Sequence, residues 1–99
     1  MKKLAKYLAV HVWEKEDFAT VGKKVIEGMP GLPEGVILRS SHCDARKTGA
    51  WCLYELDRPE VLEEFWAKQV PEMKTELIPV IQFFPPSEDL YKMMHAMAE

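Results

Sequence analysis

Hydrophobic and polar residues recur along this chain with periods that predict the order β-α-β-β-α-β, followed by one more helix. Residues 6–13, 36–43, 50–56 and 76–84 are rich in β-branched and aromatic side chains, as strands are. Apolar residues recur at helical spacing over 17–28 and 57–70, and again after Ser87, which we expect to cap the last helix. The pattern predicts one domain over residues 1–99, with its core at 6–84 and the last helix at about 87–98.

The links between these segments predict how the strands pair. Segment 44–49 is short, polar and ends in Gly49, so it predicts a hairpin between the second and third strands. Pro79 lacks a backbone N–H, which favours an edge position for the fourth strand or a local bulge in it. Right-handed crossovers would place both main helices on one sheet face and give the antiparallel order 4-1-3-2. We therefore predict an α+β protein with ferredoxin-like topology.

The first strand has two different faces, because successive side chains point to opposite sides. Leu8, Val10 and Val12 form an aliphatic face, which we expect beneath the two helices. The other face is aromatic and partly polar, and we expect it to be left uncovered. It consists of Tyr7, Ala9, His11 and Trp13.

Residues of the other three strands are expected to share this uncovered face. Arg39 would lie opposite Glu55 across the hairpin, with Cys43 on the same face as Arg39. A bulge in the second strand would instead turn His42 to this face. The remaining candidates are Ser41, Trp51 and Leu53, and on the fourth strand Ile78, Val80, Gln82 and Phe84 or their alternates.

A sheet face with so many apolar and aromatic side chains is expected to be covered by something outside the chain. Exposed patches of this kind commonly mark interfaces or ligand grooves. Two such faces packed together would form a closed barrel with a central cavity. We therefore expect a homodimer, the partner being a second copy of the chain, with room for a small molecule in the cavity.

Composition narrows the classes of partner. The chain carries 13 Lys+Arg against 16 Asp+Glu, a net charge of −3, so neither nucleic acid nor an anionic membrane is expected as a partner. No apolar run approaches the roughly 18 residues of a membrane-spanning helix. Two cysteines do not make a disulfide framework, and we expect a cytoplasmic protein with free thiols. No nucleotide-binding or serine-hydrolase motif occurs, and no cofactor is expected.

Several stretches together resemble a known family. They are His42–Cys43–Asp44, the Thr48–Gly49 turn, strand 51–55, segment 56–60 and Ile78–Pro79–Val80. They are similar to an uncharacterised family of about this size that belongs with the dimeric α/β-barrel proteins, and the resemblance covers most of residues 6–84. It implies a ferredoxin-like dimeric barrel. The wider superfamily includes cofactor-free monooxygenases, haem-degrading enzymes and small metal-binding proteins, so the resemblance implies no single chemistry.

Two titratable residues are candidates for catalysis. His11 could act as a general base, since histidine titrates near neutral pH, but we favour a hydrogen-bonded histidine in the dimer core. Glu55 could transfer protons in a dry cavity, or it could form a salt bridge with Arg39. In a catalytic cavity His11 and Glu55 would handle protons, while Arg39 and Gln82 would orient polar groups.

Other residues are candidates for ligand contact. Tyr7, Trp13 and Trp51 could line a pocket for a flat organic molecule, or pack in the dimer core. His42, Cys43 and Cys52 are weak candidates for a metal site. Zinc sites use closer cysteine pairs and four convergent ligands, so no metal site is predicted here.

Three functions stay open at this stage, and the sequence does not decide whether the protein is an enzyme. The first is the binding of a small apolar or aromatic molecule in the barrel cavity, with or without acid–base chemistry. The second is a structural or regulatory dimerisation module without catalysis. The third is a metal-binding protein that uses the His and Cys groups.

Overall fold

The computed structural model describes residues 4–98, so residues 1–3 and 99 of the predicted domain lie outside the described part. The elements follow the predicted order. They are β1 (Ala5–Val12), η1 (Lys15–Asp17), α1 (Phe18–Gly28), η2 (Met29–Gly31), β2 (Ile37–Cys43), β3 (Gly49–Leu56), α2 (Pro59–Gln69), β4 (Lys74–Val80) and α3 (Glu88–Ala98), where η marks a short 3-10 helix.

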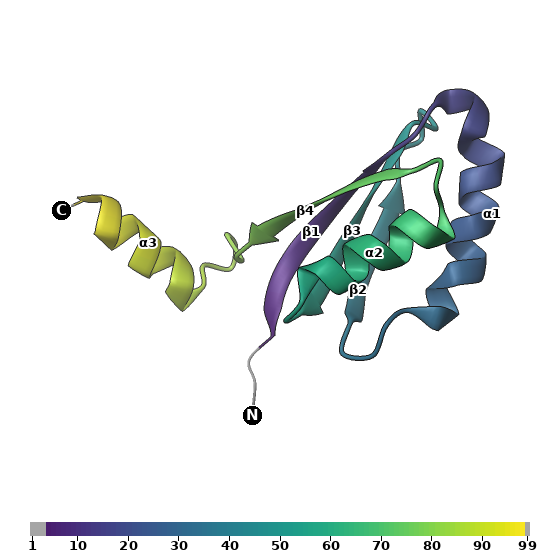
Figure 1. The fold of residues 1–99 in the computed structure, drawn as a ribbon. Coiled ribbons are helices and arrows are strands. Elements are labelled where there is room, and N and C mark those ends of the chain that lie inside the picture. Colours follow the sequence, from purple (N-terminus) through teal and green to yellow (C-terminus); the bar gives the residue numbers. More distant parts are fainter. Residues whose placement is uncertain (1–3, 99) are drawn as a thin grey trace.

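The four strands form one antiparallel sheet in the order β2-β3-β1-β4 (Figure 1). This is the predicted order 4-1-3-2 counted from the other edge, and the α+β class is confirmed. β4 is an edge strand, as Pro79 indicated, but it ends at Val80. Gln82 and Phe84 therefore lie beyond the sheet, and their predicted place on a sheet face is wrong.

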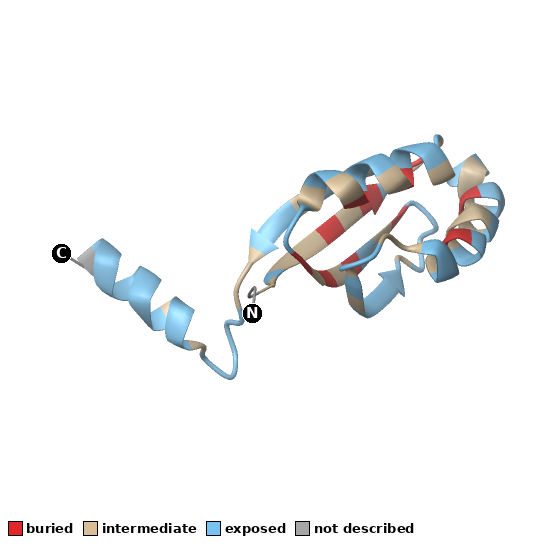
Figure 2. Cartoon of the chain, turned by 60° about the horizontal axis from the view of Figure 1, so that its bottom comes forward, coloured by how far each residue is buried: buried red, intermediate tan, exposed pale blue. Residues whose placement is uncertain are grey.

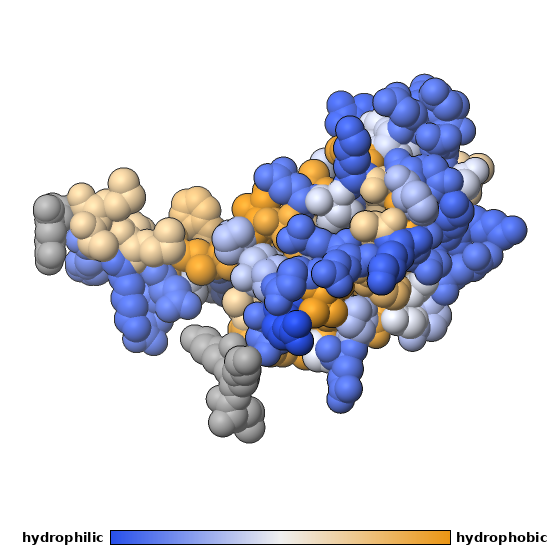
Figure 3. Space-filling model, viewed as in Figure 1, coloured by the Kyte–Doolittle hydropathy of each residue, from blue (hydrophilic) through white to orange (hydrophobic). Residues whose placement is uncertain are grey.

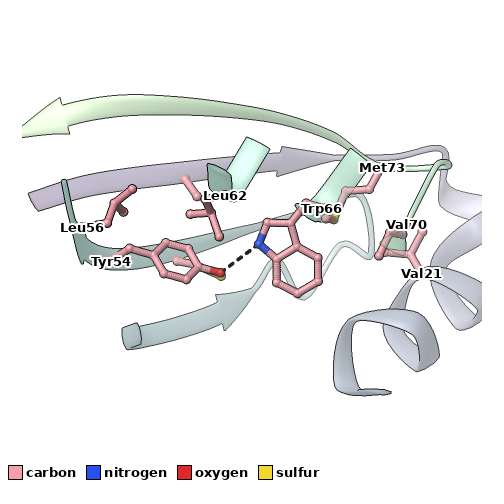
Figure 4. Packing of buried hydrophobic residues seen from close by; sticks show 9 residues of the cluster. Val21, Tyr54, Leu56, Leu62, Trp66, Val70 and Met73 are labelled. Carbon is pink, nitrogen blue, oxygen red and sulfur yellow. Dashed lines mark hydrogen bonds between the residues drawn. The ribbon is translucent and has the colours of Figure 1, made fainter. Parts of the chain in front are cut away.

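The core lies between the sheet and the helices α1 and α2, which cover one of its faces. Leu62 and Trp66 of α2 are buried together with Tyr54 and Leu56 of β3 (Figure 4). The Trp66 indole N–H donates a hydrogen bond of 3.2 Å to the Tyr54 hydroxyl, which satisfies a buried donor. Ala9 of β1 belongs to the same cluster, and its small side chain leaves room for the large side chains of α2.

The prediction for the two faces of β1 is wrong. Ala9 and His11 are buried on the helix-covered face, and Tyr7 and Trp13 pack against the same core. Val12, on the aliphatic face, is 47% exposed. The physical reason is that a polar ring can be buried when it finds a hydrogen-bond partner, and His11 finds one on β4. Hydropathy by itself therefore predicts the wrong face of β1 to be buried beneath the helices.

The opposite side of the sheet, called the open face below, is left uncovered by α1 and α2. Val10 lies opposite Trp51, and Leu8 lies between Leu53 and Ile78. Trp51 is 41% exposed, so an uncovered apolar face exists as predicted, although β1 supplies aliphatic rather than aromatic side chains to it. Its apolar residues are Leu8, Val10, Val12, Ile37, Trp51, Leu53, Ile78 and Val80.

A β-bulge decides which side chains of β2 face the helices. The pairing with β3 shifts by one residue between Leu38 and Ser40, and Arg39 is the extra residue. Beyond the bulge Ser41 lies opposite the buried Cys52, and His42 lies opposite Trp51. The placement of Ser41 and Cys43 on the open face is therefore wrong, and the bulged alternative, with His42 there, is the observed one.

Helix α1 is fastened to the end of α2 and stands at one end of the sheet (Figure 1). The Lys24 ammonium forms an ion pair with Glu72 at 2.7 Å, and the Gln69 amide donates to the Lys24 carbonyl at 3.1 Å. Gly28 packs directly against the Gln69 side chain. Most of β2 is exposed (Figure 2), so α1 is held on the α2 side and leaves a gap on the β2 side.

Helix α3 lies apart from the rest of the molecule at the end of the sheet opposite α1 (Figure 1). Ser87 caps it as predicted, because its hydroxyl accepts a hydrogen bond from the Leu90 N–H at 3.1 Å. Almost all of its described side chains are exposed (Figure 2). Over residues 4–98, no helix is both long and apolar enough to cross a membrane.

Candidate functional site

An apolar cavity of about 250 Å³ lies on the helix-covered side of the sheet, between α1, the strands and Trp66 of α2. It exists because α1 is fastened to α2 and does not close onto β2. Val21 and Val25 of α1, with Met29 of η2, form its roof, and Ala50 of β3 forms part of its floor. The polar atoms that reach this cavity come from His11, Ser41, Cys43 and Cys52.

His11 is the titratable group in the floor of the cavity, and only 3% of it is exposed. Its Nδ1 lies 2.7 Å from the Thr75 hydroxyl oxygen on β4, and its ring meets the Trp66 indole edge-on at 5.9 Å. Burial lowers the pKa of His11 from 6.5 to about 4, because the charged imidazolium would lose its hydration. His11 is therefore a neutral imidazole near pH 7, with one ring nitrogen occupied by Thr75.

Two thiols and a hydroxyl form the cavity wall next to β2. The Ser41 hydroxyl oxygen and the Cys52 sulfur are 3.2 Å apart across the two strands. Burial raises the pKa of Cys52, so its sulfur stays a protonated thiol at neutral pH. Cys43 is exposed at the mouth, where its thiol donates to the Asp44 carbonyl at 3.4 Å. The wall thus combines an inert buried thiol with an accessible one.

Trp13 closes the end of the cavity where β1 leads into α1. Its indole N–H donates to the Lys47 carbonyl in the β2–β3 hairpin at 2.9 Å, and its ring stacks on Phe18 at 6.4 Å. Trp13 therefore joins the hairpin to the first turn of α1. Of the residues predicted to bind a ligand, it is the one that the structure places at this cavity.

The predicted proton-handling pair is separated by the sheet. His11 lies beneath the helices, whereas Glu55 pairs with Lys6 and Ile37 on the other side. The Arg39 guanidinium donates twice to one Glu55 oxygen, at 2.9 and 2.6 Å, so the salt-bridge interpretation of Glu55 is confirmed. The predicted cooperation of His11 with Glu55 and Arg39 is contradicted by this placement.

The other predicted contact residues also lie away from the cavity. Trp51 is on the open face, and Tyr7 packs half-buried against the core. The Gln82 amide donates to the Pro85 carbonyl at 2.7 Å, within the segment that leads to α3. The structure therefore brings His11 and Trp13 together, and leaves Tyr7, Trp51 and Gln82 outside the site.

The three weak metal candidates do not converge. Cys43 and Cys52 line the cavity, whereas His42 is on the open face. Among residues 4–98, no group of three or more His, Cys, Asp and Glu side chains is arranged to hold a metal ion.

Thr75 is a site residue that the sequence did not reveal, whereas Ser41 was expected on the open face and lies at the cavity instead. The predicted fourth strand began at Glu76, one residue after Thr75, so the partner of His11 was not part of the expected sheet. The register of β4 places Thr75 directly opposite His11. A sequence signal did exist, because Thr75 and Leu77 alternate with the charged Lys74 and Glu76, and in the structure both lie half-buried on the same face of β4.

Comparisons with known proteins give no family for this chain. No family model matches it, and no curated protein is similar to it. Among solved structures, a de novo designed protein named Foldit4 is similar over 82% of this chain and 99% of its own, with 11% identity and a TM-score of 0.43. A likeness at that level carries no argument about function, and the resemblance to dimeric α/β-barrel proteins stays a prediction.

Proposed function

We propose that the chain binds a small, largely apolar molecule that carries one hydroxyl or comparable polar group, in the cavity beneath α1. The observation that carries the proposal is the neutral His11 in the floor of an otherwise apolar cavity. Ligand sites typically combine apolar walls with a few polar groups that fix orientation. This site replaces the predicted one on the open face.

The size of the cavity bounds the ligand. Sites for drug-sized ligands measure roughly 300–1,000 Å³, and an engineered cavity of about 150 Å³ is enough for benzene. A cavity of about 250 Å³ therefore suits a molecule with one ring or two fused rings. Trp13 and Trp66 offer aromatic surface to such a ring.

The hydrogen bonding of His11 favours a hydroxyl over a charged group. The Thr75 hydroxyl can donate to Nδ1 or accept from it, so the remaining ring nitrogen either donates or accepts. A ligand hydroxyl matches both cases. A carboxylate would have to give up its hydration in an apolar cavity without a cation among the lining residues.

Titration with two matched probes tests the proposal. We expect p-cresol, which has a hydroxyl, to bind more tightly than toluene, which has none, in calorimetry or ligand-observed NMR. The variant Ala50→Leu should fill the floor and abolish binding, whereas the same change at the exposed Ala45 in the hairpin should leave binding intact. His11→Phe should remove the preference for p-cresol. Equal binding by wild type and Ala50→Leu, or no saturable binding of either probe, would overturn the proposal.

As a second function we propose dimerisation. The open faces of two identical chains would pack together into a ferredoxin-like, dimeric α/β barrel. Its support is the exposure of large apolar residues on one sheet face: Val12 at 47%, Trp51 at 41%, Ile37 at 38% and Ile78 at 37%. Interfaces between identical chains are commonly apolar in this way. In this arrangement the ligand cavities stay on the outer sides of the barrel.

Sedimentation velocity tests the dimer separately from the cavity. We expect wild type to sediment as a dimer at micromolar concentration. Trp51→Glu should give monomers that still bind p-cresol, and Lys68→Glu on the exposed side of α2 should leave the dimer unchanged. A wild-type monomer would remove the dimer proposal without touching the ligand proposal.

We propose a cytoplasmic location for the protein. Cys43 and Cys52 are both free thiols, and an exposed free cysteine such as Cys43 suits a reducing compartment. Fractionation of cells that produce the tagged protein tests this location, and recovery from the culture medium would contradict it.

A further inference from the structure

Helix α3 carries a stripe of apolar side chains that nothing in the described chain covers. Leu90, Met93, Met94 and Met97 recur at three- and four-residue spacing, which places them on one side of the helix. Met93 is 56% exposed, Met94 57% and Met97 89%. Figure 3 shows the apolar residues of α3 gathered along one side of the helix, with hydrophilic residues on the other.

This helix has too little support of its own. Isolated helices shorter than roughly 12–15 residues are marginal in water. Helix α3 has 11 residues, and its internal stabilisation consists of the Ser87 cap and the exposed Glu88–Lys92 ion pair. A surface against which the stripe packs would therefore stabilise α3.

The charges of α3 point to protein rather than to lipid. Helices that lie on membranes carry an excess of Lys and Arg on the polar side, which attracts anionic headgroups. Glu88 and Asp89 outnumber the single Lys92 on α3, so the helix is weakly acidic. An anionic bilayer would repel it.

The symmetry of the proposed dimer indicates which protein. Each subunit of a symmetric pair would both contribute one stripe and receive one. The stripe runs along an 11-residue helix about 16 Å long, so two stripes would add apolar contact to the interface between the open faces.

We propose that α3 of each chain packs against a second copy of the chain and completes the interface begun by the open faces. This inference rests on the proposed open-face dimer. The segment that carries α3 leaves β4 just after Ile78 and Val80, which belong to the open face, so the stripe continues that apolar surface.

Two charge-matched variants test the role of the stripe. Met93→Glu combined with Met94→Glu places two carboxylates in the stripe. His95→Glu combined with Ala96→Glu places two on the opposite side of the same helix. We expect the first variant to raise the dimer Kd at least about 30-fold, because two buried methionines are lost, and the second to change it less than about 3-fold. Sedimentation equilibrium measures both, and p-cresol binding checks that each variant is folded.

The outcomes separate this inference from the dimer on which it rests. A wild-type dimer whose Kd is the same in both variants overturns the role of α3 and leaves the open-face dimer standing. A wild-type monomer at micromolar concentration overturns both. The wild-type protein could instead be a monomer that floats with vesicles of phosphatidylcholine and phosphatidylglycerol. If Met93→Glu with Met94→Glu abolished that flotation, α3 would be assigned to a membrane and the inference would be overturned.

Discussion

The two faces of one sheet differ more in what their side chains contact than in how hydrophobic they are. Beneath the helices lie a histidine, a tyrosine and a thiol, each with a polar partner, as in the contacts of His11 with Thr75 and of Cys52 with Ser41. The open face holds Leu8, Val10 and Trp51, and is the more aliphatic of the two. Burial in this fold therefore follows available partners and space for α2, and the aliphatic surface left outside indicates a partner molecule.

The two tryptophans of the opposite faces give the largest expected contrast. Trp66→Ala should lower the free energy of unfolding by about 3–5 kcal/mol, because it empties the centre of the core. Trp51→Ala should change the stability of the isolated subunit by less than about 1 kcal/mol, since its ring is 41% exposed. Urea titrations below the dimer Kd measure both. Equal losses would mean that the open face is packed within a single chain.

Acid should destabilise the covered face through His11. Its pKa is about 4 in the folded chain against 6.5 for an ordinary histidine, so the unfolded chain takes up the proton first as the pH falls. Stability from this group is complete above pH 6.5, declines through that pH and levels off below about pH 4, with a total loss of about 3 kcal/mol.

Two variants separate the effect of His11 on acid stability from the effect of carboxylates that become protonated in the same pH range. His11→Gln should flatten the decline measured by urea titration at successive pH values. His42→Gln, on the open face, should keep the wild-type profile. A decline that is the same in all three proteins would show that His11 is not its cause.

Removing the partner of His11 should cost less than removing a core ring. Thr75→Val leaves the imidazole nitrogen without its hydroxyl in a buried place, which should lower the free energy of unfolding by about 1–3 kcal/mol. Thr75→Ser keeps the hydroxyl and serves as the control, with a loss of less than about 1 kcal/mol. If the serine variant is as unstable as the valine variant, the methyl group and not the hydrogen bond stabilises this position.

Breaking the ion pair between Arg39 and Glu55 should have the smallest effect on stability. Arg39→Ala breaks the contacts with Glu55, but the arginine side chain is 54% exposed. Exposed ion pairs contribute about 0–1 kcal/mol, so thermal unfolding should change little, and less still in high salt. A loss as large as that of Thr75→Val would mean that the pair is buried by a second subunit.

Much of the fold follows from periodicity, and the site does not. The hairpin at 44–49 and the cap at Ser87 are local features, and the strand order follows from the sequence of elements and the right-handedness of the crossovers, so all three were predictable from the sequence. The side of β1 that faces the helices depends on whether α2 has space above Ala9 and on whether His11 meets Thr75, 64 positions away. A one-residue change of register reverses every such assignment. The cavity itself depends on the contacts of Lys24 with Glu72 and Gln69, which no local pattern reveals.

The bulge at Arg39 decides which of the later residues of β2 face the helices and which lie on the open face. In an unbroken ladder with the same Leu38–Tyr54 pair, Ser40 and His42 would turn inward, and an imidazole would replace the Cys43 thiol at the cavity. Deleting Arg39 would straighten the strand and keep Ser41 and Cys43 inward, at the loss of the ion pair to Glu55. The bulge, rather than the length of β2, thus determines whether this strand presents the Cys43 thiol or the His42 imidazole to whatever enters the cavity.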